Sequence, residues 1–335
     1  MRPDPNHIIE LSSAYYGSAV LFAASDLGIF GALAGGAKTA PQLAGELNLE
    51  ERSTRILLDG CVTVGLLEKS TEGLYTNPLA TSVFLVPGSP GDLSSAIRYN
   101  RDVYPAWGHL ADFARTGKPV ELPELHLGAD AERTRTFVLS MHGRALAIGR
   151  AIVPILDLKG RRRLLDVGGG PGTWSVLMAQ ANQAIDCTVL DLPPVAAIAA
   201  ELITQQGMSD RVKTLPGNYH ETPFPSGVDV VSFFGMLHQE SPEGICNLLR
   251  KAYEALEPGG LVQVLDMMTD ATRTRPVFSA LFAVNMALTT RNGWVFSDAD
   301  LQTWMEEAGF VDFTCNPVPP PMPHWLATAK KPAAS

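Results

Sequence analysis

A glycine-rich segment in the middle of the chain, residues 163–174, most constrains what the chain can fold into. It reads Arg-Leu-Leu-Asp-Val-Gly-Gly-Gly-Pro-Gly-Thr-Trp, a short apolar run followed by a turn and then by residues with helical character. Glycine lacks Cβ, so the backbone of such a turn can approach a ligand beside the N-terminus of a helix. The segment therefore predicts an α/β sheet that binds a nucleotide-like cofactor.

The spacing of the glycines distinguishes two classes of cofactor. A dinucleotide-binding turn has the pattern G-x-G-x-x-G, and Thr173 occupies its last position here. The chain instead has G-x-G-x-G at Gly168, Gly170 and Gly172, with Asp166 two residues before the first glycine. The turn also contains no lysine or arginine that would neutralise a pyrophosphate. We expect a cofactor without phosphate; a glycine-rich connection without a ligand stays the alternative.

After this turn the hydrophobic pattern alternates between strand and helix, as a parallel α/β sheet requires. Besides the strand at 164–167, strands are expected at 187–191, 211–215, 228–234 and 261–266. Helices are expected at 193–206, 241–256, about 276–289 and 297–308, and a closing hairpin at 310–316 and 325–330. Gly259 and Gly260 are expected to end the second of these helices, at 241–256.

The N-terminal part has a different pattern, which predicts a winged-helix domain. Residues 8–34 have helical periodicity, and Thr39 is a plausible N-cap with Pro41 in the first turn of the next helix. Two short helices meet near Asn48, and two short strands follow at 66–68 and 73–75. We predict a dimerisation domain at 1–92, a helical linker or substrate lid at 93–160, and a catalytic domain at 161–335.

Charge argues against DNA as the partner of this winged helix. Between residues 39 and 85, three basic residues stand against six acidic ones, and the whole chain has a net charge of -9. Phosphate contacts dominate DNA affinity and need a positive surface. The apolar first helix instead predicts a homodimer interface.

The sequence predicts a cytoplasmic protein without a membrane segment. The N-terminus has no apolar signal region, and no run approaches the roughly 18 apolar residues of a spanning helix. The four cysteines, Cys61, Cys187, Cys246 and Cys315, are scattered without a C-x-x-C pair, so we expect neither disulfides nor a metal site.

Polar residues follow the ends of the predicted strands, where an open parallel sheet binds its ligand. Asp191 lies 23 residues after Gly168, a spacing at which a carboxylate accepts hydrogen bonds from both ribose hydroxyls. Asn218 offers a donor and an acceptor to an adenine edge, and Tyr219 offers a flat face. For Asp191, the alternative is that it only caps the following helix.

His238 is the candidate catalytic base. It follows the predicted strand 228–234 and an apolar run that would desolvate it, and imidazole is the side chain best suited to take a proton near neutrality. Asp266, at the end of the neighbouring strand, would orient the ring and stabilise the imidazolium. A lone histidine in apolar surroundings is otherwise a core or capping residue.

Aromatic and polar residues outside the strands are candidates for the acceptor pocket. For the candidates between residues 93 and 160, the alternative is that the segment is only a helical linker and that its aromatic side chains pack in the core. The candidates are Tyr104, Trp107, Met141, His142, Arg144, Asn285, Met286 and Trp294.

With these motifs in order, nearly the whole chain resembles the S-adenosylmethionine (SAM)-dependent small-molecule O-methyltransferases of the plant caffeate and bacterial polyketide, hydroxyneurosporene and acetylserotonin type. The resemblance rests on the segments 165–172, 191–193, 217–219, 237–239 and 256–260. It implies a Rossmann-like class I methyltransferase sheet, an interlocked N-terminal dimer, SAM as cofactor, a small-molecule acceptor and His238 as general base. The candidate cofactor-binding residues are Asp166, Gly168, Gly170, Gly172, Asp191, Leu192, Asn218, Tyr219 and Phe234.

The chain departs from the family pattern at several of these positions. Gln239 and Glu240 replace the Asp-Trp that follows the histidine, Asn218-Tyr219 replaces Asp-(Met/Phe), and Phe234 replaces a lysine of the plant members. A second acid that flanks the histidine in plant members maps near Val295. Three rival functions therefore stay open: C-methylation of a tetrapyrrole or keto acid, a winged-helix regulator that binds SAM without catalysis, and an NAD(P) oxidoreductase.

Overall fold

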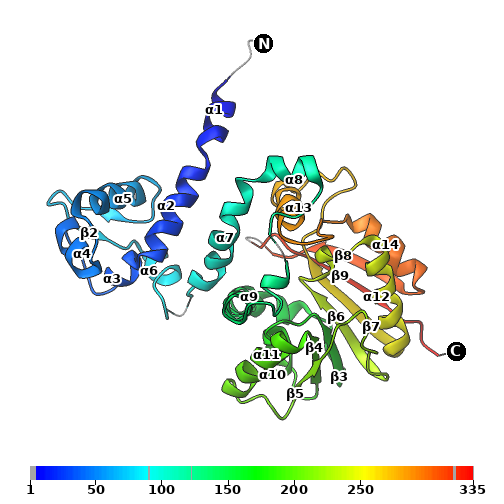
Figure 1. Ribbon diagram of the computed structural model, residues 1–335. Helices are drawn as coiled ribbons and strands as arrows, with labels where there is room; N and C mark the ends of the chain where they lie inside the picture. Colours follow the sequence, from blue (N-terminus) through cyan, green and yellow to red (C-terminus); the bar gives the residue numbers. More distant parts are fainter. Residues whose placement is uncertain (1–4, 90, 122, 320–321, 335) are drawn as a thin grey trace. The chain divides into compact units, whose positions relative to one another are not determined.

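The structure is a computed structural model that describes residues 5–89, 91–121, 123–319 and 322–334. The chain divides into two compact units, Met1–Arg101 and Asp102–Ser335, which Figure 1 draws from blue to cyan and from cyan to red. Each unit is described by itself. In the described parts of the chain, no helix is both long and apolar enough to cross a membrane.

The N-terminal unit is helical with one small β-ladder. Its elements are α1 (Asn6–Ser13), α2 (Tyr15–Asp26), α3 (Ile29–Ala32), α4 (Ala40–Leu47), α5 (Glu51–Thr63), β1 (Glu68–Lys69), β2 (Tyr75–Thr76) and α6 (Leu79–Phe84). The helical segment predicted at 8–34 is divided into three helices, and Gly28 adopts a left-handed conformation (φ 73°) at the start of α3.

Local signals in this unit behave as predicted. Thr39 caps α4 in a reciprocal capping box with Gln42, and Asn48 ends the helix in a left-handed conformation. β1 and β2 pair antiparallel after α5, at 68–69 and 75–76 rather than at the predicted 66–68 and 73–75, and Lys38 bridges to Tyr75. The order helix, turn, helix and two-stranded ladder is the one predicted for a winged helix.

Helix α7 (Ser94–Trp107) contains Pro105 and runs across the boundary between the two units. The second unit then continues with α8 (Leu110–Thr116), the 3-10 helix η1 (Pro123–Leu125), α9 (Ala131–Ile152) and η2 (Val153–Ile155) before the sheet begins. Residues 93–160 are thus largely helical, as predicted.

The sheet of the second unit has seven strands in the order β5-β4-β3-β6-β7-β9-β8. The parallel strands are β3 (Arg163–Val167), β4 (Asp186–Asp191), β5 (Val212–Pro216), β6 (Val228–Phe234) and β7 (Leu256–Asp266), and β9 (Trp325–Lys330) pairs antiparallel with β7 and with β8 (Val311–Pro317). The helices are α10 (Thr173–Ala181), α11 (Pro193–Gln205), η3 (Leu237–Gln239), α12 (Pro242–Ala255), α13 (Val277–Thr289) and α14 (Asp298–Glu307). The predicted Rossmann-like α/β sheet is confirmed.

One predicted boundary is wrong. Gly259 and Gly260 do not end helix α12, because the helix stops at Ala255 and β7 already begins at Leu256. Leu256 pairs with Val228, and the register then shifts before Leu261 pairs with Val230. The glycines lie in this irregular part of the strand, where Gly259 has a positive φ of 77°.

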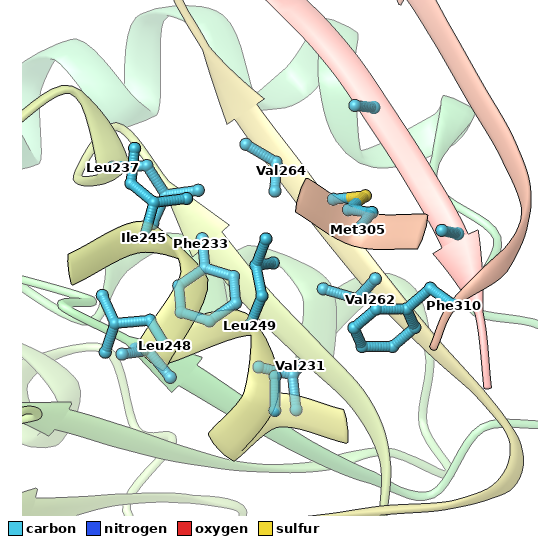
Figure 2. Packing of buried hydrophobic residues seen from close by; sticks show 14 of the residues in the cluster. Val231, Phe233, Leu237, Ile245, Leu248, Leu249, Val262, Val264, Met305 and Phe310 are labelled. Carbon is cyan, nitrogen blue, oxygen red and sulfur yellow. The ribbon is translucent and has the colours of Figure 1, made fainter. Parts of the chain in front are cut away.

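Alternate residues of the strands point to opposite faces of the sheet, and each face has its own core. Figure 2 shows Val231 and Phe233 among residues of α12 and α14, such as Leu248, Leu249 and Met305, and Leu165 belongs to the same core. Their neighbours in sequence, such as Leu164 and Val230, pack with residues of α9, α10 and α11. Because both faces are covered, the strands read in sequence as nearly continuous apolar runs.

The order of the strands locates a crevice. β3 pairs with β4 on one side and with β6 on the other, so the chain switches direction across the sheet at β3. In open α/β sheets, ligands bind outside the carboxyl ends of the strands at such a switch point. The glycine turn after β3 lies there.

We expect Gly169→Ala to destabilise the second unit by about 1–3 kcal/mol through overpacking. A Cβ at this position would lie 2.8 Å from the Asp166 carboxyl and from Val189, both buried. Thermal unfolding measures the effect. Gly160→Ala is the control, because Gly160 has a positive φ of 78° and open space around it, so backbone strain alone should cost about 1–2 kcal/mol. A Gly169→Ala protein as stable as the wild type would contradict the close packing.

Candidate active site

Three residues of the glycine turn have a left-handed backbone conformation, which glycine adopts more readily than any other residue. Gly168, Gly170 and Gly172 have φ values of 63°, 56° and 70°, and Gly172 is the N-cap of α10. A Cβ on Gly168 would lie 3.1 Å from Met236, whereas a Cβ on Gly170 would meet nothing within 4 Å. The turn therefore leaves open space at Gly170, as a cradle for a ligand requires.

Asp191 ties the second strand to this turn. Its Oδ2 accepts a hydrogen bond from the Gly170 N–H at 2.8 Å, and its Oδ1 accepts one from the Leu192 N–H at 2.7 Å. Burial raises the pKa of Asp191 to about 6, even though these two N–H groups lower it. A carboxylate has about four acceptor sites, so Asp191 keeps capacity for a vicinal diol.

Asp166 and Phe234 pack beside the turn and the start of α10. Asp166 is fully buried beneath the glycines, accepts a hydrogen bond from Ser175 Oγ at 2.7 Å, and has its pKa raised by burial to about 7. Phe234 is 6% exposed and packs edge-to-face on Trp174 with ring centroids 5.2 Å apart. Both positions support the turn through packing.

The segment after β5, residues 217–222, is called the cofactor loop below. The Gly217 N–H donates to the carbonyl of Asp191 at 2.8 Å, and Asn218 Oδ1 accepts from the His220 N–H at 3.0 Å. Tyr219 donates its hydroxyl to Glu240 Oε1 at 2.6 Å. The loop thus joins the end of β4 to the segment that carries His238.

His238 and Asp266 form a buried pair at the ends of two neighbouring strands, β6 and β7. His238 Nδ1 lies 2.6 Å from Asp266 Oδ1, and the two residues are 8% and 1% exposed. The His238 N–H also donates to Asp266 Oδ2 at 3.3 Å, and the Met267 N–H donates to Oδ1 at 2.8 Å. A carboxylate only accepts, so this contact is the one that a proton on Nδ1 would make. No described residue binds Nε2.

The predicted acceptor-pocket residues fall into groups that make different contacts. His142 Nδ1 lies 2.7 Å from Thr173 Oγ1 at the start of α10, and burial lowers the pKa of His142. Trp107 Nε1 donates to Asn285 Oδ1 at 2.9 Å, which links α7 to α13.

Other candidates differ in burial. Met286 is almost buried and Tyr104 is 36% exposed, while Met141 and Arg144 are half-buried on α9. Trp294 contacts the segment that carries His238, because its backbone N–H donates to the His238 carbonyl at 2.9 Å and its Nε1 donates to the Glu240 carbonyl at 2.8 Å. Its ring packs against Trp304.

Sequence reasoning missed His324 and Glu240. His324 lies one residue before Trp325, which pairs with Asp266 across the β7–β9 ladder. Its Nδ1 is buried without a partner among the described residues. Burial and the nearby Arg144 lower the pKa of His324 to about 4. A proline-rich loop precedes His324, and no periodic pattern could have marked it.

The residues at the crevice fit SAM. The open space at Gly170, the spare acceptor sites of Asp191 and the absence of a basic residue from the turn suit a ribose-bearing cofactor without phosphate. When bound, SAM supplies a methyl group already activated on a sulfonium.

Comparisons with known proteins agree with this geometry. Family models match at residues 107–311, an O-methyltransferase domain, and at residues 9–87, an O-methyltransferase dimerisation domain. The chain is 32% identical to 3-hydroxy-5-methyl-1-naphthoate 3-O-methyltransferase of Streptomyces sahachiroi, over 91% of this chain and 89% of that one. It is 30% identical to L-tyrosine C(3)-methyltransferase of Streptomyces lavendulae, over 88% and 83%.

A solved structure is also similar over its full length. The crystal structure of human N-acetylserotonin methyltransferase in complex with SAM superposes with a TM-score of 0.88 at 25% identity, and 99% of each chain is covered. The fold, the glycine turn and the matched domains lead to one conclusion. The chain belongs to the SAM-dependent O-methyltransferase family.

Proposed function

We propose that this enzyme methylates a hydroxyl group of a small aromatic or polyketide-like molecule and that His238 is the general base. The observation that carries the proposal is the 2.6 Å contact between His238 Nδ1 and Asp266 Oδ1. With Nδ1 bound to Asp266, the lone pair of Nε2 is the free basic site of the ring.

The dyad would act on the acceptor hydroxyl in one step. Nε2 would take the proton of the acceptor hydroxyl as its oxygen gains the methyl group, and the buried carboxylate of Asp266 would stabilise the imidazolium that forms. SAM, when bound, would supply that methyl group, and its methyl–sulfur bond would break with the electron pair kept by sulfur. General-base assistance of this kind contributes about 10²–10⁴-fold in rate. The family departure at Gln239 leaves this pair intact, because Asp266 comes from a different strand, β7.

The chain's own residues would hold the cofactor at three points. The backbone at Gly168 and Gly170 leaves room for it, Asp191 accepts from the two ribose hydroxyls, and Asn218 with Tyr219 borders the adenine. This arrangement orients the reacting groups, and orientation supplies a large part of the acceleration when the donor is already activated.

An aromatic acceptor suits the side chains near the dyad. Phe282 packs edge-to-face on the His238 ring with centroids 5.1 Å apart. Trp107 donates to Asn285 of α13, and both of these residues belong to the second unit. A relative 32% identical to this chain is named for a hydroxynaphthoate acceptor. We propose that His324, through its unpartnered Nδ1, contacts a polar group of the acceptor.

The homodimer is supported by the surface of the N-terminal unit. The matched dimerisation domain covers residues 9–87. Ile8, Ile9 and Leu11 on α1 are 61–71% exposed, and Tyr15 and Tyr16 at the start of α2 are 53% and 60% exposed. Large apolar side chains that are exposed next to one another in the chain are typical of a protein interface.

C-methylation is the second candidate function. A relative 30% identical to this chain is named a C-methyltransferase of tyrosine, and the same base would deprotonate a phenol before attack through a ring carbon. Nuclear magnetic resonance of the product separates the two reactions, because an O–CH₃ and a C–CH₃ group resonate apart.

We expect His238→Ala and Asp266→Asn each to lower turnover by about 100-fold or more. The first variant removes the base, and the second replaces the carboxylate by a neutral amide, which no longer stabilises the imidazolium and no longer fixes the proton on Nδ1. SAM affinity, measured by calorimetry, should stay within about twofold in His238→Ala, because Nε2 acts on the acceptor.

His109→Ala is the matched control for this experiment. The His109 side chain is 62% exposed between α7 and α8, so turnover should not change. Wild-type turnover in His238→Ala with the native acceptor would reject the general-base role.

The affinity for SAM should fall as the pH is lowered through 6. The pKa of Asp191 is raised to about 6, so the carboxylate that accepts from the ribose is present above this pH and is lost below it. One pH unit below the pKa, about a tenth of the carboxyl is ionised, and the dissociation constant should rise about fivefold to tenfold from pH 8 to pH 5. Asp191→Asn should bind SAM more weakly with a flatter pH profile. An unchanged profile in this variant would contradict the ribose contact.

A further inference from the structure

Glu240 is a buried carboxylate with no part in the chemistry described above. It is 7% exposed and follows directly after η3, the short helix that carries His238. One of its oxygens accepts from Tyr219 Oη at 2.6 Å, and the other lies 3.1 Å from His220 Nε2. Glu240 therefore connects the cofactor loop (217–222) to the segment of the base.

The surroundings of Glu240 hold its side chain in this position. Gly244 lies in the first turn of α12, and a Cβ there would lie 2.7 Å from Glu240 Oε2. The Glu240 carbonyl accepts from Trp294 Nε1 at 2.8 Å, and its N–H donates to the Leu237 carbonyl at 3.0 Å. Backbone and carboxylate are thus both fixed.

The cofactor loop is bound on its other side as well. Lys251 Nζ on α12 contacts the carbonyls of Tyr219, His220 and Thr222, the last at 2.9 Å. These contacts order the backbone of the loop but do not reach the His238 segment. Glu240 connects the loop to that segment, because it lies two residues after His238 and its carboxylate binds Tyr219.

The hydrogen bond between Tyr219 and Glu240 joins two positions that differ from the family pattern. Burial and the adjacent carboxylate raise the pKa of Tyr219, so its hydroxyl stays a donor at neutral pH. A hydrogen bond to a charged group contributes more than one between neutral groups, and a buried carboxylate that loses a partner is costly. The tyrosine and the glutamate therefore belong together as a pair.

We propose that Glu240 is a positioning residue that fixes the cofactor loop relative to His238 through Tyr219 and His220. It thereby sets where the adenosine lies with respect to the base. This inference rests on the proposed placement of the adenine beside Asn218 and Tyr219.

A double-mutant cycle on SAM affinity tests the pair. Tyr219→Phe and Glu240→Leu should each raise the dissociation constant for SAM about tenfold, and the double variant should be no weaker than the weaker single one, because both remove the same interaction. Glu240→Gln keeps an acceptor for the Tyr219 hydroxyl and should retain most of the affinity.

Two controls and two contrary outcomes complete the experiment. Tyr253→Phe removes another half-buried hydroxyl of this unit and Glu243→Gln an exposed carboxylate of α12; neither should change SAM affinity. The proposal would be overturned if the increase in the dissociation constant for SAM in the double variant equalled the product of the increases in Tyr219→Phe and Glu240→Leu. It would also be overturned if these variants had a lower unfolding temperature but an unchanged affinity for SAM.

The double-mutant cycle tests the positioning role of Glu240 independently of the general-base role of His238. Undiminished turnover in His238→Ala rejects the base without altering the result of the cycle. Independent effects of Tyr219 and Glu240 reject the positioning role and leave the base intact.

Discussion

The hydrogen bond between His238 and Asp266 depends on the register of two parallel strands. β6 and β7 pair from Val230 with Leu261 to Phe234 with Leu265, so Asp266 lies just beyond the last pair. The chain after β6 turns through Gly235 (φ 68°), whose N–H donates to the Leu265 carbonyl at 2.8 Å. Because of this turn, His238 lies beside Asp266. A shift of one residue in the register would point the carboxylate to the opposite face of the sheet.

The cofactor side of the crevice is organised by the neighbouring strands β3, β4 and β5. The glycine turn extends β3, Asp191 ends β4, and the cofactor loop follows β5, each linked to the next by a backbone hydrogen bond or by the Asp191 carboxylate. Glu240 connects this chain of contacts to the His238 segment. The two halves of the site are thereby held by one continuous set of hydrogen bonds on a sheet whose two faces are packed.

Much of this arrangement could be predicted from local sequence. The apolar runs and the glycine spacing predicted the parallel strands and the turn, and β6 and β9 begin and end at the predicted residues. The pairing of His238 with Asp266 followed from their positions at strand ends. The start of β7 at Leu256 could not be predicted, because two glycines usually end a helix and only the pairing with Val228 extends the strand across them.

Contacts between segments that are distant in the sequence could not be predicted either. Glu240 accepts from a tyrosine 21 positions earlier, and His324 lies after a proline-rich loop, one residue before β9. Neither residue belongs to a motif or a periodic pattern from which its contacts could be predicted. Their roles depend on tertiary packing.

The protonation state of the His238 ring tests the central claim most directly. Nitrogen resonances of the enzyme labelled with ¹⁵N in histidine, assigned by comparison with His238→Gln, report which ring nitrogen carries the proton at pH 8. The account predicts a proton on Nδ1, held by Asp266, and an unprotonated Nε2. A proton on Nε2 with an unprotonated Nδ1 would contradict it, because Nε2 could then take no proton from the hydroxyl of the methyl acceptor.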